Sequence, residues 1–376
     1  MALLARTIGP AEFSIFAASY GIAIIIQTVT DFGLTAHIIR SRAVEPKGRQ
    51  AGSALHLVAR INVAVCILGL TAAGTAAFFN SALVPLIPLA VWVAADKHVE
   101  AWLGIPLADG AVWQNASSLI FRRSIALFFL LFGIALGRSE LYLYCLGLAV
   151  GSIVAAISVQ IVNTRKVAVG QAFSLKRTLA ESYPFYSNSV ATQMRNLDTF
   201  LVALVLSPVA SGLYGAASRL TSPLRIVPTS FANILMPAAA RQAGGTSGKL
   251  TRPVIMLIAF TSVMYAAIAI VMPYAVPLLL GVEYEHAIPV IQIVCAGLVF
   301  AAIASQLNSL LQGWGHLIAV SRISWSTTVF CLLAIVGLGP MLGVNGCGIA
   351  LALSYVLQVA LQAVYMVRHR RRLSNA

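Results

Sequence analysis

Ionisable side chains inside long apolar segments are the residues of this sequence that could carry chemistry. Each such group costs roughly 2.5–3.5 kcal/mol at the centre of a bilayer, so it needs a cavity, a partner or a route to the interface. The acidic members are Asp31, Asp96, Glu100, Glu181 and Asp198. The basic members are more numerous: Arg6, Arg60, Lys97, Arg122, Arg123, Arg195, Arg219, Arg225 and Arg322. This excess of positive charge favours an anionic ligand over a cationic one.

Two of the arginines, Arg122 and Arg123, lie near the middle of one apolar segment. Adjacent helical residues point about 100° apart, so at most one of them can face a given cavity fully. An arginine that faces a cavity here would contact a phosphate group of the substrate. The alternative is that the segment starts later and both side chains reach the interface along their aliphatic stems.

Three further arginines are candidates for the same cavity. Arg195 lies three residues before Asp198, so it either binds a ligand or neutralises that acid on one helix face. Arg219 and Arg225 lie on one segment, which is interrupted by two prolines, Pro223 and Pro228. Proline breaks of this kind are typical of helices that line a transport pathway. The predicted substrate-binding residues are therefore Arg122, Arg123, Arg195, Arg219 and Arg225.

The acidic candidates suggest coupling to an ion. Asp96 and Glu100 share a helix face at i, i+4, so they could share a proton or hold a cation, unless Lys97 neutralises them. With Asp198 they are the candidates for coupling to H⁺ or Na⁺. The cysteines are scattered without CxxC spacing, and we expect neither a metal site nor a cofactor.

The composition indicates what holds these residues in place. Hydrophobic residues make up 59% of the 376 residues, charged residues 10%, and the mean hydropathy is +0.89. Globular proteins carry roughly a quarter charged residues, so this chain cannot coat a water-facing surface of its size. A soluble enzyme, a disordered chain and a disulfide scaffold are excluded. The net charge of +14 lies in clusters between apolar runs, which argues against nucleic acid as a partner.

A bilayer-spanning helix needs about 20 mostly apolar residues, and the sequence contains eleven such segments. They are 11–38, 52–79, 82–106, 110–136, 139–163, 179–206, 208–240, 251–279, 287–312, 317–340 and 345–367. Alternate connections, at 40–49, 164–178, 241–252 and the tail, are strongly basic. The positive-inside rule places those connections, and with them the C-terminus, in the cytoplasm.

The two halves of the chain repeat each other. Gly9–Ala18 resembles Ser207–Ala216, and each block opens a long segment that ends in a basic loop. The repeat predicts two pseudo-symmetric lobes of six helices each, a common transporter plan. The first lobe lacks a full opening helix, so we expect a twelfth helix of which residues 1–8 are the remnant. The predicted domains are an N-terminal lobe 1–163, a cytoplasmic loop 164–178, a C-terminal lobe 179–367 and a basic tail 368–376.

Several motifs resemble those of bacterial polysaccharide transporters of the O-antigen flippase type. They are Arg6–Phe13 running into Asp31-Phe32-Gly33-Leu34, Asn196-Leu197-Asp198 followed by Gly212–Leu220, Leu310–Gly315, and Gly343–Ala350. Such proteins belong to the multidrug/oligosaccharidyl-lipid/polysaccharide exporter superfamily. The resemblance implies two six-helix lobes around a central cavity that opens alternately to each side of the bacterial cytoplasmic membrane.

The function that this resemblance implies is the flipping of an undecaprenyl-diphosphate-linked oligosaccharide for surface polysaccharide synthesis. The expected partners are that substrate, membrane lipids and other polysaccharide assembly proteins. A drug/cation antiporter of the same superfamily is the first alternative, and it predicts a cavity dominated by acids. A membrane-embedded polymerase or ligase is the second, but the large outer loop expected of such an enzyme is missing. We therefore expect a transporter and not an enzyme.

Overall fold

The chain is helical throughout the part that its structure, a computed structural model, describes. That part comprises residues 2–137, 139–167, 175–206, 214, 226–241, 251–280 and 288–374. The chain divides into two compact units, Met1–Tyr186 (unit 1) and Ser187–Ala376 (unit 2). The predicted all-α class is confirmed.

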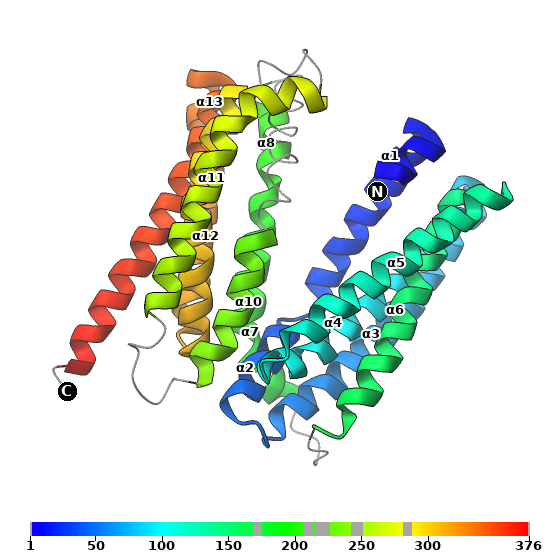
Figure 1. Cartoon of the computed structure of the whole chain (residues 1–376), viewed down its shortest axis with the longest axis horizontal. Coiled ribbons are helices and arrows are strands. Elements are labelled where there is room, and N and C mark those ends of the chain that lie inside the picture. The colour runs from blue at the N-terminus through cyan, green and yellow to red at the C-terminus, as the bar shows by residue number, and fades with distance from the viewer. Residues whose placement is uncertain are drawn as a thin grey trace. The chain divides into compact units, whose positions relative to one another are not determined.

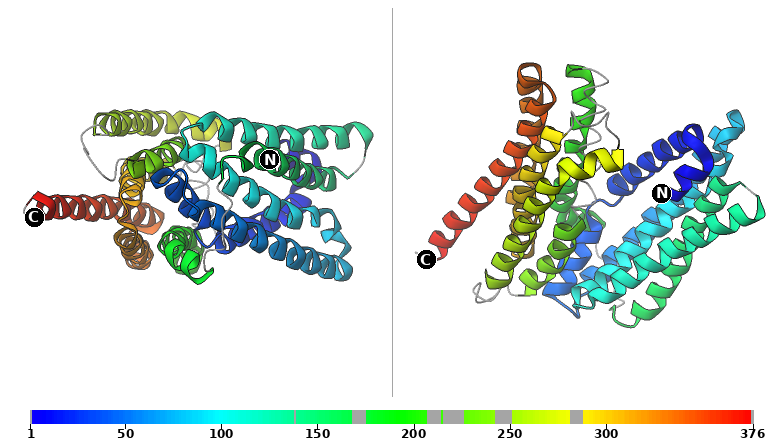
Figure 2. Two further views of the ribbon diagram at one scale, coloured as in Figure 1. Left: turned by 90° about the horizontal axis from the view of Figure 1, so that it is seen from below. Right: turned by 45° about the horizontal axis from the view of Figure 1, so that its top comes forward.

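Unit 1 is a bundle of long helices (Figure 1). Its elements are α1 (Ala2–Thr30), α2 (Leu34–Val44), α3 (Gln50–Phe79), η1 (Ser81–Leu86), α4 (Pro88–Ala108), α5 (Val112–Leu136), α6 (Glu140–Thr164) and the first part of α7 (Leu175–Met194). Helix α4 packs against α2, α3 and α6, and α6 also packs against α5. Figure 2 shows α3 to α6 running alongside one another.

The close packing of α5 on α6 depends on two glycines of α6. A Cβ atom at Gly151 would lie 3.1 Å from the carbonyl oxygen of Arg122, and one at Gly147 would lie 2.9 Å from the Cα of Ala126. The GxxxG spacing of these two glycines is typical of such a close approach between helices. The approach brings Ser152, the next residue of α6, to the level of Arg122.

Helices α1 and α2 form a broken pair. They meet at a bend of 46°, and at the break Phe32 has φ 47° and Gly33 has φ 72°. A Cβ atom at Gly33 would lie 2.7 Å from the carbonyl oxygen of Ser182 on α7. Glycine is therefore required here both by its positive φ and by the close approach of α7. The predicted segments 1–8 and 11–38 are not separate in the structure, because α1 continues through Gly9 and Pro10.

Arg42, in the last turn of α2, holds one end of unit 1 together. Its guanidinium binds Asp109 at the end of α4, with Nε 2.9 Å from Oδ1 and Nη2 3.1 Å from Oδ2. Its Nη1 donates to the carbonyl oxygen of Lys166, beyond α6, at 2.8 Å. The connections after α2, α4 and α6 thus share one end of the unit, as the charge pattern predicts for the basic loops.

Unit 2 is built around α12. Its elements are the end of α7, η2 (Arg195–Leu197), α8 (Asp198–Val205), α10 (Ile226–Arg241), α11 (Thr251–Leu280), α12 (Ile288–Gly313) and α13 (Leu317–Ser374). Helix α12 packs against α10, α11 and α13. Helix α13 is two helices joined across a kink at Gly343, where φ is 63° and ψ is −145°.

The described helices include seven that are long and apolar enough to cross a membrane, or eight if the bent pair α1–α2 counts as one span. Helices α3, α5, α6, α11 and α12 agree within a few residues with segments predicted from the sequence. Residues 317–368 contain two predicted segments joined across the Gly343 kink. The predicted segment 208–240 lies partly outside the described residues. The chain is therefore a multi-pass membrane protein.

Candidate functional site

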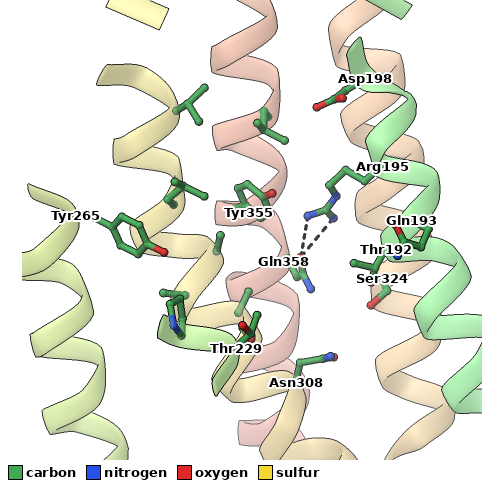
Figure 3. Close-up of a pocket in the computed structure, with 18 residues that line it drawn as sticks. Thr192, Gln193, Arg195, Asp198, Thr229, Tyr265, Asn308, Ser324, Tyr355 and Gln358 are labelled. Atoms are coloured by element: carbon green, nitrogen blue, oxygen red, sulfur yellow. Dashed lines mark hydrogen bonds between the residues drawn. The ribbon is translucent and has the colours of Figure 1, made fainter. Parts of the chain in front are cut away.

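A polar cavity of about 290 Å³ lies inside unit 2. Helices α7, α8, α10, α11, α12 and α13, together with η2, contribute to its wall. Figure 3 shows the residues that line it. The polar ones are Thr192, Gln193, Arg195, Asp198, Thr229, Tyr265, Ser305, Asn308, Ser324, Tyr355 and Gln358. Hydroxyl and amide groups thus surround a single arginine and a single aspartate.

Arg195 is the cation of this cavity. It occupies the single 3₁₀ turn η2, where the helical run of α7 is interrupted before α8 begins. Its buried guanidinium donates from Nη2 to Thr327 Oγ1 at 3.0 Å. Both Nη atoms also donate to Gln358 Oε1 at 3.3 Å (Figure 3). The same guanidinium carbon lies 4.8 Å from the ring centre of Tyr355. These partners are all neutral, so they orient the positive charge without cancelling it.

The cavity also holds polar atoms that no described residue satisfies. Arg195 Nε is a buried donor and Asn308 Oδ1 a buried acceptor, and neither has a hydrogen-bond partner within the part of the chain that the structure describes. In a membrane protein an unsatisfied polar group costs several kcal/mol. A polar ligand could satisfy both, because it would supply an acceptor to one and a donor to the other.

Asp198 is the acid of the cavity. It begins α8, where the positive end of the helix dipole favours a carboxylate. Its Oδ2 accepts a hydrogen bond of 2.8 Å from the hydroxyl of Tyr214. The structure therefore brings Arg195 and Asp198, two of the residues predicted from the sequence, to one cavity.

Two more of the predicted residues, Arg122 and Asp96, form a buried ion pair in unit 1. Arg122 Nη1 on α5 binds Asp96 Oδ1 on α4, and Ser152 on α6 donates to the same oxygen at 3.0 Å. The neighbouring Arg123 is exposed. Adjacent positions on α5 thus place one arginine in the bundle and the other outside it.

Glu100, the remaining acidic candidate, belongs to a second cluster of unit 1. Lys97 Nζ lies 2.9 Å from Glu100 Oε2 and 3.4 Å from Asp31 Oδ1. Asp96 and Glu100 share a face of α4, but each binds a different cation. Arg219 and Arg225 lie outside the described residues, so their predicted role stays a prediction.

Sequence reasoning missed the neutral part of the cavity. The uncharged lining residues include Tyr265, Asn308, Tyr355 and Gln358. Asn308 and Gln358 could have been noticed in the sequence, because an amide side chain is costly inside an apolar membrane segment. Among the described residues, no group of three or more His, Cys, Asp or Glu side chains could hold a metal ion.

Solved structures with a similar fold include those of MATE transporters. A multidrug resistance MATE family transporter of the MOP superfamily, in an outward-facing conformation, matches with a TM-score of 0.83 at 14% identity, over 100% of this chain and 91% of that one. A MATE structure in the straight conformation matches with a TM-score of 0.80 at 14% identity, over 99% and 90% of the two chains. The Vibrio cholerae MATE transporter VcmN in its bent form matches with a TM-score of 0.74 at 13% identity, over 94% and 86%.

At the level of sequence, no curated protein matches the chain. The model of one protein family, described as Polysaccharide biosynthesis protein, matches residues 3–289. The resemblance seen in the sequence motifs is thus confirmed by a match over most of the chain and by the fold. The chain belongs to the Polysaccharide biosynthesis protein family.

Proposed function

We propose that this protein flips a lipid-linked oligosaccharide from the cytoplasmic to the periplasmic leaflet of the bacterial cytoplasmic membrane, for surface polysaccharide synthesis. The family supports a role in polysaccharide biosynthesis, and the fold supports transport. The lipid carrier is undecaprenyl diphosphate, whose tail stays in the bilayer while the polar part crosses. The process has no chemical step, so the protein is not an enzyme.

The observation that carries this proposal is the cavity around Arg195. A buried guanidinium that donates to a neutral hydroxyl and a neutral amide can bind an anionic group through charge-assisted hydrogen bonds. The surrounding hydroxyls and amides suit sugar hydroxyls. Arg122, by contrast, is neutralised by Asp96 and serves the fold of unit 1.

Alternating access is the proposed mechanism. The solved MATE structures are described as outward-facing, straight and bent, so this fold adopts more than one conformation. We place the C-terminus and the basic connections in the cytoplasm, in accordance with the positive-inside rule. The ion that drives the cycle is H⁺ or Na⁺ in this proposal, and Asp198 in the cavity is the acid best placed to sense it.

The test replaces Arg195 by Gln and by Lys in a host that lacks its own copy of the gene. We expect Arg195→Gln to lower surface polysaccharide at least tenfold at an unchanged membrane level, because each lost charge-assisted contact contributes about 1.5–3 kcal/mol. Arg195→Lys should retain part of the activity, since it keeps the charge but not the planar fork. Arg322→Gln, which removes an exposed arginine of α13, is the matched control. Normal polysaccharide from Arg195→Gln would refute the role of this cavity.

A drug/cation antiporter is the second candidate, and Asp198 in the cavity is the observation that favours it. A cationic drug would bind the carboxylate and would be repelled by Arg195. For this function, Asp198→Asn should abolish drug resistance while Arg195→Gln leaves it intact. The proposed flippase predicts no drug resistance from the wild-type protein in a drug-sensitive host.

A further inference from the structure

A second hollow lies in unit 1, where the first turns of α5 face the last turns of α6. It measures about 400 Å³, and its lining includes Trp113, Ser118 and Phe121 of α5 with Ser158, Val159 and Asn163 of α6. From Trp113 to Phe121 a helix rises about 12 Å, so the groove reaches from the end of the two helices into the depth of the acyl chains. It is separate from the cavity of unit 2 and takes no part in the proposed flipping.

Two polar atoms in the wall of this groove have no partner. Ser118 and Asn163 are 8% and 1% exposed, and Ser118 Oγ and Asn163 Oδ1 form no hydrogen bond with any described residue. The Asn163 amide nitrogen donates to Val159 at 2.9 Å, which leaves the amide oxygen as a pure acceptor. The groove therefore calls for a ligand that carries a hydrogen-bond donor.

Basic residues follow the end of α6 that lines the groove. Arg165 and Lys166 follow α6 directly, two and three residues after Asn163, and both are exposed. The turn is held in place by Arg42, which binds the Lys166 carbonyl oxygen at 2.8 Å. Arg42 also binds Asp109, so that acid does not offset the charge of Arg165 and Lys166. The mouth thus carries positive charge and attracts an anion.

The remaining lining residues match the region where lipid headgroups meet acyl chains. Trp113 is 72% exposed at the end of α5, and an exposed tryptophan at this depth is typical of the membrane interface. Phe121 and Val159, deeper in the groove, offer apolar contact to a chain. A ligand that fills the groove must therefore be amphipathic as well as anionic.

We propose that this groove binds a phosphatidylglycerol-type phospholipid. Its phosphodiester meets the charge of Arg165 and Lys166, and a hydroxyl of its glycerol headgroup donates to Asn163. One acyl chain lies along Phe121 and Val159. Phosphatidylethanolamine has a donor but no net charge, so it does not meet both requirements.

The experiment uses Trp113 as a local reporter in the purified full-length protein, reconstituted into vesicles. Quenching of tryptophan fluorescence by brominated phosphatidylglycerol is compared with quenching by brominated phosphatidylcholine at equal mole fraction. The chain has five tryptophans, so the signal of the Trp113→Phe variant is subtracted to isolate Trp113. We expect a preference for phosphatidylglycerol that weakens about fivefold for each basic residue removed in Arg165→Gln and Lys166→Gln.

Two matched controls separate this site from general membrane charge. Lys47→Gln with Arg49→Gln removes two exposed basic residues from another connection of unit 1 and should leave the preference unchanged. Asn163→Ala should reduce the preference for phosphatidylglycerol. Asn62→Ala, which removes another buried asparagine with an unpartnered amide nitrogen, should leave that preference unchanged. Equal quenching by the two lipids in the wild-type protein, or a preference that survives the loss of Arg165 and Lys166, would overturn the proposal.

Discussion

The buried ion pair of Asp96 and Arg122 offers the sharpest test of how unit 1 is held together. Both residues are 5% exposed, and they link α4 to α5 while Ser152 adds a hydrogen bond from α6. Removing one partner of such a pair leaves the other charge buried and uncompensated, at a cost of about 3–5 kcal/mol. We expect that cost for Asp96→Asn and for Arg122→Gln.

The melting temperature provides the readout. Unit 1, Met1–Tyr186, falls in the size class of about 150–250 residues, in which each kcal/mol of lost stability lowers the melting temperature by about 2–4 °C. Each single variant should therefore melt about 6–20 °C lower than the wild-type protein. Thermal unfolding of the purified protein in detergent, followed by fluorescence, measures this directly. The double variant Asp96→Asn/Arg122→Gln leaves no buried charge and should recover most of the loss.

Arg123→Gln is the matched control, because it removes an exposed arginine from the next position of α5. It should change the free energy of unfolding by less than about 0.5 kcal/mol. If Arg122→Gln were as mild as Arg123→Gln, or if the losses of the two single variants simply added in the double variant, the ion pair would not be what stabilises this part of unit 1.

Two further predictions concern the glycine at the α1–α2 break and the orientation of the chain. Gly33→Ala should destabilise the protein by about 2–5 kcal/mol in the same melting assay, because it adds a steric clash with α7 to the strain of a positive φ. Gly137 also has a positive φ but has open space around it, so Gly137→Ala should cost only about 1–2 kcal/mol. Equal losses would show that α7 yields to the new side chain. A reporter fused after Lys166 should be cytoplasmic and one fused after Gly137 periplasmic, since α6 lies between them; finding both on one side would contradict the proposed orientation.

The helices were predictable because apolar length alone determines which segments can cross a membrane. For α3, α5 and α6 the predicted boundaries differ from the observed ones by only a few residues. The break between α1 and α2 was not predictable from hydropathy, which does not register a positive φ. The continuity of the backbone through Gly9 and Pro10 was likewise missed, since proline usually marks the beginning of a helix rather than its interior.

The charged residues were predictable as a set, but their pairing was not. A single charged side chain in an apolar segment is visible in the sequence, whereas its partner on another helix depends on the register between helices. The register of α5 and α6 is set by the close approach at Gly151, and it decides that Ser152 and Arg122 meet Asp96. The pairing of Lys97 with Glu100 is local to α4 and could be seen in the sequence, whereas nothing local to α4 indicates that Asp96 binds an arginine of α5.

The two buried arginines, Arg122 and Arg195, differ in the partners that bind them. Arg122 is bound by a carboxylate, and a second anion there would have to displace Asp96 and leave that acid buried without its cation. Arg195 donates to an amide and a hydroxyl and lies against an aromatic ring, while the carboxylate that attracts it, Asp198, lies in the same cavity. Both arginines are buried in an apolar bundle, but the amide and the hydroxyl to which Arg195 donates are neutral, whereas Arg122 binds a carboxylate directly. A cargo that carries negative charge is the ligand that would make use of the positive charge of Arg195.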